Sequence, residues 1–265
     1  MQRFSGKVAL VTGGSSGIGR AAAVAFARDG ARVVLAARGE TRGAEVAREI
    51  NKGGGAATFV PADISKAIEI EALVTRTVEL YGRLDYAFNN AASNEGGIGS
   101  IVEFTEKQFE RAIGVNLKSV WLCMKYEIQQ MLKQTGPGGA IVNTSSINGL
   151  GGSPAGAFYS AAKAGVLALT KSAAQEFAAR GIRVNALVAG AFRTPMLDAA
   201  MDTLSGGDEE RRKTVESRYL ELIPQRRIGD PAEAAEAALW LCSDAASYVT
   251  GHSMIVDGGM TAWAR

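Results

Sequence analysis

Three side chains in the second half of the chain have the types and the spacing needed for proton exchange with an alcohol or a ketone. Tyr159 and Lys163 are four residues apart, and Ser146 lies thirteen residues before the tyrosine. On a helix, residues at i and i+4 share one face, so the phenol and the amine can act on one reacting atom. A free phenol has a pKa of about 10, and a neighbouring ammonium lowers that pKa by stabilising the phenolate. Because such a pair is also common in ordinary amphipathic helices, its interpretation depends on the motifs around it.

A glycine-rich segment near the N-terminus has the pattern of a phosphate-binding turn. The run Thr12-Gly-Gly-Ser-Ser-Gly-Ile-Gly19 follows an apolar segment that predicts a strand, and a helical pattern begins within it. Glycines let the backbone approach a pyrophosphate, and a helix N-terminus offers unpaired N–H groups to the anion. A tight turn without a ligand is the alternative, but the place between a first strand and a helix favours a dinucleotide. The residues expected to contact it are Gly13, Ser15, Ser16, Gly17, Ile18 and Gly19.

The end of the second predicted strand indicates which dinucleotide is bound. An acid there binds the ribose 2′-hydroxyl of NAD, whereas an arginine accommodates the 2′-phosphate of NADP. The segment 33–38 contains no acid and ends in Arg38, whose planar guanidinium suits a phosphate. NADP is therefore favoured, and NAD remains possible. Asp63, after the third strand, is expected to cap the following helix, to accept a hydrogen bond from the adenine amino group, or both.

Short β-branched runs alternate with helical patterns along the whole chain. Strands are predicted at 7–11, 32–36, 58–60, 84–88, 140–143, 182–187 and 253–256. Helices are predicted at 17–29, 41–51, 65–81, within 109–133, and at 157–180 and 231–243. Continuously apolar strands separated by helices are typical of a parallel sheet covered on both faces. The predicted fold is therefore α/β, a Rossmann-type doubly wound sheet of about seven parallel strands with helices on both faces.

No repeat or linker interrupts this alternation, so residues 1–265 are predicted to form a single dinucleotide-binding domain. The least regular part is 191–227, which contains a proline, two adjacent glycines and a charged helical stretch. We expect this part to form a substrate-binding lid; a surface excursion without function is the alternative.

Composition excludes several other classes of protein. The formal charge is +2, too small to indicate a nucleic-acid or anionic-membrane partner. His252 is the only histidine, and Cys123 and Cys242 lie apart in apolar helical patterns, so neither a metal site nor a disulfide is expected. No apolar stretch reaches membrane-spanning length, and there is no secretory leader, which predicts a cytoplasmic protein.

These motifs together resemble the short-chain dehydrogenase/reductase family, in the family's order and over nearly the whole chain. The glycine-rich turn matches its Thr-Gly-x-x-x-Gly-x-Gly, and the segment 89–92 resembles its Asn-Asn-Ala-Gly. Ser146, Tyr159 and Lys163 match its active-site pattern, and Asn116 lies where the family has an asparagine in its long helix. The segments 189–194, 250–251 and 257–259 also resemble family motifs.

The resemblance implies a catalytic tetrad. Tyr159 would be the general acid in reduction or the base in oxidation, and Lys163 would lower its pKa and bind the nicotinamide ribose. Ser146 would orient the substrate oxygen, although Ser145 competes for that role, and successive strand residues face opposite sides. Asn116 would hold a water beside Lys163; alternatively, it only satisfies backbone groups in a helix bend.

The resemblance also implies further contacts and an assembly state. The additional cofactor contacts would be Ile64, Asn90, Ala91, Gly190, Phe192 and Thr194. The substrate would be a small carbonyl compound or alcohol, and its contacts would include Ser93, Asn94, Asn148 and Phe192. Glu95 is a candidate for attracting a cationic substrate. A homotetramer is expected.

Two positions depart from the family pattern: Ala92 replaces a glycine, and Ala189 replaces a proline. We expect both to change the shape of the pocket without abolishing activity. Two rival functions are an epimerase or dehydratase using the same Tyr/Lys pair, and a nucleotide-sensing protein with the same fold. The first resembles longer chains with an added C-terminal domain, and the second often lacks part of the tetrad.

Overall fold

Seven parallel strands form one sheet at the centre of the molecule. The computed structural model describes residues 2–94, 98–136 and 138–262. All strand pairs are parallel, as the continuous apolar runs predict. The strands lie in the order β3 (Ala56–Pro61), β2 (Arg32–Ala37), β1 (Val8–Thr12), β4 (Tyr86–Asn89), β5 (Gly139–Ser146), β6 (Ile182–Ala189) and β7 (Ser253–Val256). The predicted doubly wound fold is confirmed.

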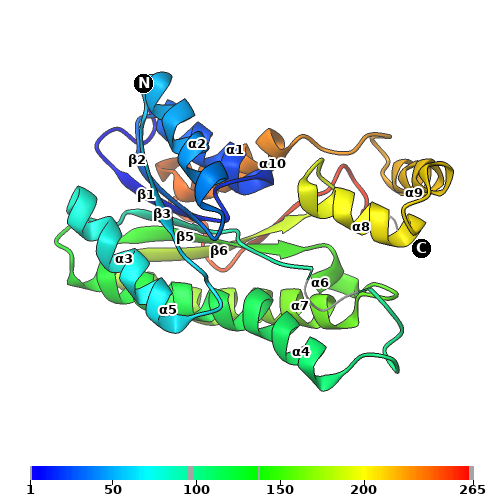
Figure 1. Cartoon of the computed structure of the whole chain (residues 1–265). Helices are drawn as coiled ribbons and strands as arrows, with labels where there is room; N and C mark the ends of the chain where they lie inside the picture. Colours follow the sequence, from blue (N-terminus) through cyan, green and yellow to red (C-terminus); the bar gives the residue numbers. More distant parts are fainter. Residues whose placement is uncertain (1, 95–97, 137, 263–265) are drawn as a thin grey trace.

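Helices cover both faces of this sheet because successive strand residues point to opposite sides (Figure 1). One face packs against α1 (Gly17–Arg28), α2 (Glu40–Lys52) and α10 (Pro231–Cys242). The other face packs against α3 (Ala67–Tyr81), α5 (Ser119–Lys133) and α7 (Ala157–Phe177). On β1 the alternation is direct: Val11 belongs to the first core and Leu10 to the second.

The strand order places a crevice at the carboxyl ends of β1 and β4. From β1 the chain winds outward through β2 to β3, and it then returns to β4 on the other side of β1. At such a switch point the connections after neighbouring strands leave in opposite directions, and ligands bind in the gap. The glycine-rich turn follows β1, and Asn90 follows β4, so both predicted motifs lie at this edge.

The long helix predicted within 109–133 is interrupted. The structure has α4 (Glu106–Ile113), a π-helical turn (Gly114–Lys118) and then α5. The Asn116 side chain donates a hydrogen bond from Nδ2 to the carbonyl of Ala112, at 3.1 Å. A side chain that bonds into the backbone ladder is a recognised cause of such an interruption, and π-helical turns are frequent at functional sites. A short helix, α6 (Asn148–Gly151), is an addition that the sequence did not predict.

The segment 191–227 is more regular than predicted. It forms α8 (Pro195–Ser205) and α9 (Glu209–Leu222), both beyond the carboxyl edge of the sheet (Figure 1). The side chains of Thr194 and Asp208 cap the two helices. The adjacent glycines form the bend between the helices, where Gly206 adopts φ 65°. The charged helical stretch noted in the sequence corresponds to α9, and α8 is a further helix, with its own cap, in what the sequence showed as the least regular part.

Cys123 and Cys242 are both buried and unpaired, as predicted. Among the helices that the structure describes, none is both long enough and apolar enough to cross a bilayer.

Candidate active site

A cavity of about 930 Å³ opens at the carboxyl ends of the strands. It is lined by every predicted cofactor, catalytic and substrate residue except Gly19. Those residues are Gly13, Ser15, Ser16, Gly17, Ile18, Arg38, Asp63, Ile64, Asn90, Ala91, Ser93, Asn94, Asn116, Ser146, Asn148, Tyr159, Lys163, Gly190, Phe192 and Thr194. Glu95 lies outside the described residues.

The glycine-rich turn is closely packed against the loop after β4. Gly13 and Gly17 adopt positive φ angles of 68° and 52°, which disfavour other residues. A Cβ atom at Gly13 would lie 2.9 Å from the Cα of Ala91. Gly19 lies beneath the turn, where a Cβ atom would be 2.3 Å from the carbonyl oxygen of Gly13. Gly19 therefore shapes the turn without reaching the cavity surface.

Thr12 connects this turn to the segment after β4. Its hydroxyl accepts hydrogen bonds from the backbone N–H groups of Asn90 and Ala91, at 3.1 and 3.2 Å. The Asn90 side chain donates back to the carbonyl of Thr12 at 3.3 Å. The backbone groups of Asn90 and Ala91 are thus held in place by the protein itself.

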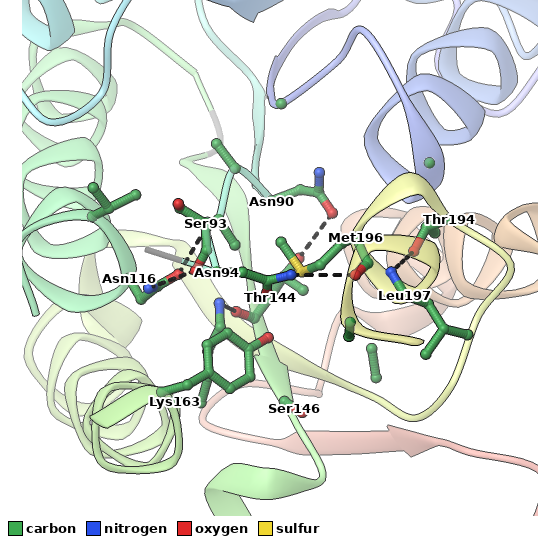
Figure 2. A pocket seen from close by; sticks show the side chains of 18 of the residues that line it. Asn90, Ser93, Asn94, Asn116, Thr144, Ser146, Lys163, Thr194, Met196 and Leu197 are labelled. Carbon is green, nitrogen blue, oxygen red and sulfur yellow. Dashed lines mark hydrogen bonds between the residues drawn. The ribbon is translucent and has the colours of Figure 1, made fainter. Parts of the chain in front are cut away.

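Ser146, Tyr159 and Lys163 converge at one wall of the cavity. Ser146 ends β5 and Tyr159 lies in the first turn of α7, and the Ser146 hydroxyl is close enough to the phenol to lower its pKa. The Lys163 Nζ atom lies 5.6 Å from the centroid of the Tyr159 ring. It donates a 2.8 Å hydrogen bond to the carbonyl of Thr144 (Figure 2). These three side chains come together as their spacing predicted.

The neighbouring serine has a different environment. The Ser145 hydroxyl donates to the backbone carbonyl of Lys163 at 2.8 Å and is buried. The Ser146 hydroxyl instead accepts from the N–H of Asn148 at 3.2 Å and lowers the pKa of the Tyr159 phenol. The alternation of side chains along β5 therefore leaves Ser146, and not Ser145, beside Tyr159.

The acid–base properties of this group differ from the prediction. Burial raises the pKa of Tyr159 to about 12, and the hydrogen bond with Ser146 opposes that rise only in part. Burial also lowers the pKa of Lys163 to about 8. Desolvation of both groups therefore outweighs the depression of the phenol pKa that the neighbouring ammonium was expected to cause.

Asn116 is engaged with backbone groups on both sides. Its Oδ1 accepts from the N–H of Ser93 at 3.0 Å, and its Nδ2 donates to the carbonyls of Ser93 and Ala112 (Figure 2). The side chain is 1% exposed. These contacts match the alternative structural role predicted for it, and they join the π-helical turn to the loop after β4.

Arg38 and Asp63 line the end of the cavity where a dinucleotide was predicted to bind, which we call the nucleotide end. The Oδ1 atom of Asp63 accepts a hydrogen bond from the N–H of Ser65 at 3.0 Å. The N-cap residue of α3 is Lys66, and no side chain makes a capping hydrogen bond at this helix start. The predicted capping role of Asp63 is therefore wrong: it stabilises the turn before the helix. Burial alone would raise the pKa of Asp63, but the Ser65 hydrogen bonds and the charges of Lys66 and Arg38 lower it overall.

Residues of α8 line the opposite end of the cavity, which we call the substrate end after its predicted role. The Asn94 side chain donates to the carbonyl of Met196 at 3.2 Å, which joins the loop after β4 to this helix (Figure 2). The Thr194 hydroxyl accepts from Leu197 N–H and donates to the carbonyl of Phe192. Asn94 and Thr194 thus both have partners within the protein.

Sequence reasoning missed several lining residues. They include Ile98, Leu197, Ala200, Leu204 and Tyr219, and also Ala36, Ala37, Glu110, Arg111 and Val115. The spacing of 197, 200 and 204 is that of one helix face, so the hydrophobic periodicity of α8 was a usable signal. The other residues reach the cavity only through tertiary packing.

Comparisons with known proteins identify relatives over the full length. A family model described as enoyl-(acyl carrier protein) reductase matches residues 13–261. A 2,5-dichloro-2,5-cyclohexadiene-1,4-diol dehydrogenase of Sphingobium indicum is 42% identical over 263 residues, covering 99% of this chain and 100% of the relative. The short chain dehydrogenase/reductase astE of Aspergillus oryzae is 43% identical, covering 98% and 97%. The crystal structure of levodione reductase superposes with a TM-score of 0.94 at 35% identity, covering 99% of this chain and 100% of that one.

These relatives are named as dehydrogenases and reductases, and they match this chain from end to end. The matching region includes the glycine-rich turn, the serine, tyrosine and lysine of the cavity, and the C-terminal strand. The chain therefore belongs to the short-chain dehydrogenase/reductase family and is an NAD(P)-dependent oxidoreductase that acts on CH–OH groups and carbonyls.

Proposed function

We propose that this enzyme catalyses reversible hydride transfer between NADP(H) and a ketone or secondary alcohol, with Tyr159 as the proton donor or acceptor. The convergence of Ser146, Tyr159 and Lys163 in one cavity carries this proposal. An alcohol becomes a ketone by losing a hydride from carbon and a proton from oxygen, so the protein needs one group to exchange that proton.

The residues present fit a dinucleotide. A side chain at Gly13 would collide with Ala91, so only glycine lets the turn pack closely against the loop after β4, at the edge where a pyrophosphate would lie. The first turn of α1 presents its N–H groups at the same place, and Ser16 at its N-cap makes no side-chain capping bond. Gly13, Ser15, Ser16, Gly17 and Ile18 would hold the phosphates. The bound nicotinamide would supply or accept the hydride.

Each side chain of the catalytic wall has a separate part in the proposal. The Ser146 hydroxyl donates to the substrate oxygen and holds it beside the Tyr159 hydroxyl. Tyr159 gives its proton to that oxygen in reduction, and its high pKa keeps the phenol protonated at neutral pH. Lys163, one helical turn away, stabilises the phenolate that forms. Asn116 holds the loop of Ser93 in position through its three backbone hydrogen bonds.

NADP is favoured over NAD because Arg38 follows β2 and lines the cavity. The segment 33–38 offers no carboxylate to bind the ribose 2′-hydroxyl that distinguishes NAD. A NAD-dependent enzyme of the same family is the second candidate, supported by the absence of another basic side chain in the turn at Ser15 and Ser16.

We further propose that α8 and α9 form the substrate side of the same domain, because Leu197, Leu204 and Tyr219 line the cavity there. The family resemblance supports a homotetramer. Light scattering on purified protein would test the assembly state.

Replacing Tyr159 with phenylalanine tests the proposed chemistry. The substitution removes the exchangeable proton and one hydrogen bond, so we expect turnover to fall at least about 100-fold while stability changes by about 1 kcal/mol. Steady-state oxidation of NADPH with a panel of ketones, together with NADPH binding, measures both effects. Tyr248→Phe, at a fully exposed tyrosine, is the matched control and should behave as the wild type. Near-normal turnover in Tyr159→Phe would contradict the assignment.

A further inference from the structure

A cluster of buried polar side chains lies one residue below the cavity, and the proposed chemistry does not use it. The cluster consists of Glu127 on α5, Asn89 on β4, Asn143 on β5 and Thr170 on α7, which we call the Glu127 network. Glu127, Asn143 and Thr170 are each 0% exposed, and Asn89 is 3% exposed. Polar groups at this depth are destabilising unless their hydrogen bonds are completed.

The hydrogen bonds of the network branch from the Asn89 amide. The Asn89 Nδ2 atom donates to Glu127 Oε2 at 2.9 Å and to Asn143 Oδ1 at 3.0 Å. The Asn143 Nδ2 atom in turn lies 3.0 Å from Thr170 Oγ1 and donates to it. Both hydrogens of the Asn89 amide are therefore used.

Two acceptor atoms remain without a partner, and they belong to the same pair. These are Asn89 Oδ1 and Glu127 Oε1. A carboxylate cannot satisfy an amide oxygen, because both are acceptors. A proton on Glu127 Oε1 would satisfy both orphan atoms at once, through an O–H bond to Asn89 Oδ1. We propose that Glu127 is protonated in the native protein, forms a neutral acid–amide pair with Asn89, and through that pair positions the carboxyl ends of β4 and β5 for the reaction.

The electrostatic surroundings agree with a neutral acid. Burial raises the pKa of Glu127 to about 8, and the Asn89 hydrogen bond opposes that rise only in part. The residues that bond within the network from β4, β5 and α7 are uncharged amides and a hydroxyl. Among the described residues, the titratable group that interacts with Glu127 is the Cys123 thiol, one turn earlier on α5, whose own pKa is raised by burial. Within the part of the chain that the structure describes, no cation contributes to the pKa of Glu127, so an ionised Glu127 would lack a partner of opposite charge.

The network is in direct covalent connection with the active site. Asn89 and Asn143 are register partners of neighbouring strands. The residue after Asn89 is Asn90, which holds the glycine-rich turn, and the residue after Asn143 is Thr144, whose carbonyl accepts from Lys163 Nζ. Thr170 lies seven residues, about two turns, beyond Lys163 on the same face of α7. Glu127 is thus a positioning residue, and this second part of the inference rests on the proposed function.

Glu127→Gln tests the protonation state, because a glutamine amide can make both bonds and never ionises. Between the ordinary carboxyl pKa of about 4.3 and the native value of about 8, the folded wild type holds a proton that the unfolded chain lacks. In that range, each rise of one pH unit therefore increases the unfolding constant of the wild type about tenfold. We expect the ratio of the wild-type to the Glu127→Gln unfolding constant to rise about tenfold per unit from pH 5 to 7.5 in urea titrations. Glu71→Gln, at an exposed acid of α3, should show no such slope.

Infrared difference spectra provide a second reading that requires no turnover. Wild type minus Glu127→Gln should contain the carbonyl stretch of a protonated carboxylic acid at pH 6.5. Parallel unfolding curves for the two proteins, or a carboxylate band in the difference spectrum, would overturn the protonated pair whatever the enzyme's substrate proves to be.

The positioning role is tested by pH profiles of kcat/KM. We expect Glu127→Gln to remain within about threefold of the wild type at pH 6.5, and the ratio of mutant to wild-type kcat/KM to rise at least tenfold by pH 9.5. Glu127→Leu leaves the Asn89 amide without its partner and should lower kcat/KM at least tenfold at pH 6.5. Identical pH profiles of kcat/KM for the wild type and Glu127→Gln would overturn the positioning role. This comparison remains decisive even if Glu127→Leu fails to fold. Failure of the proposed function is read separately, from retained turnover in Tyr159→Phe.

Discussion

The two ends of the cavity are built in different ways. At the nucleotide end the shape is set by backbone against backbone: Gly19 lies against the Gly13 carbonyl, and Gly13 lies against Ala91. At the substrate end the wall consists of side chains on α8 and α9, of which Leu204 is 49% exposed. The first end leaves no room for an added methyl group, whereas the second can be altered without disturbing the sheet.

The two ends of the cavity are also attached to the rest of the protein in different ways, the nucleotide end more rigidly than the substrate end. The glycine-rich turn continues directly from β1, whose residues are all buried in the sheet. The α8–α9 unit is held by a small separate core around Met201, Ile223 and Ile228. Surface ion pairs from Arg212 to Asp198 and Asp202 join its two helices. Exposed ion pairs contribute little stability, so the substrate end is the more tolerant of change.

The largest effect is expected from Gly19→Ala. The added methyl would lie 2.3 Å from the Gly13 carbonyl oxygen and 2.6 Å from Asn90 Nδ2, so the turn must shift. We expect the free energy of unfolding to fall by about 2–3 kcal/mol and the affinity for NADPH to fall at least about tenfold. Urea unfolding and fluorescence titration measure these quantities.

Gly53→Ala is the matched control for that substitution. Gly53 has φ −78°, and a Cβ atom there would lie 3.4 Å from its nearest neighbour. Its stability should stay within about 0.5 kcal/mol of the wild type. If Gly19→Ala resembled this control, the backbone of the nucleotide end would be less constrained than its close contacts indicate.

A smaller effect, mainly on the selectivity between NADPH and NADH, is expected from Arg38→Asp. The substitution removes a cation that suits the 2′-phosphate and adds a carboxylate that repels it and can accept from a 2′-hydroxyl. The ratio of kcat/KM with NADPH to that with NADH should fall by about 10- to 100-fold. The unfolding free energy should fall by no more than about 1 kcal/mol, because Arg38 stabilises the Asp63 carboxylate across a cavity that is open to solvent. An unchanged ratio would show that Arg38 does not read the 2′-phosphate.

The smallest effect is expected at the substrate end, from Leu204→Ser. Full burial of a leucine is worth about 1.5–3 kcal/mol, and this side chain is about half exposed. We expect KM for an apolar ketone to rise a few-fold and the free energy of unfolding to fall by about 1 kcal/mol, with NADPH binding unchanged. Leu222→Ser, at a leucine of α9 that is 44% exposed and outside the cavity lining, is the control. Equal KM values for the two variants would separate Leu204 from substrate binding.

Sequence reasoning succeeded where chemistry depends on close spacing. Tyr159 and Lys163 occupy one helix, Ser146 ends a strand thirteen residues earlier, and the glycine-rich turn is a continuous segment. In each case the covalent chain itself fixes the relation between the residues. The parallel sheet was also predicted correctly, because strands buried on both faces have continuously apolar sequences.

Two of the failures have a long-range origin, and the third is local. The high pKa of Tyr159 results from burial by neighbours that lie far away in the sequence, which outweighs the nearby amine. The interruption of the long helix depends on Asn116, whose side chain bonds both to its own helix and to the distant Ser93. Asp63 was expected to cap α3 but bonds within the preceding turn, a difference of only a few residues.

The sequence by itself determined the order of the elements, the place of the glycine-rich turn and which residues we propose for proton exchange, because these depend on local backbone geometry and short spacings. Only the tertiary structure decided how these groups ionise, which side chains of α8 and α9 line the substrate end, and that Glu127 meets Asn89 beneath the site. The reason is that desolvation and long-range hydrogen bonds depend on which segments come together in space, and the covalent chain does not specify those distances directly.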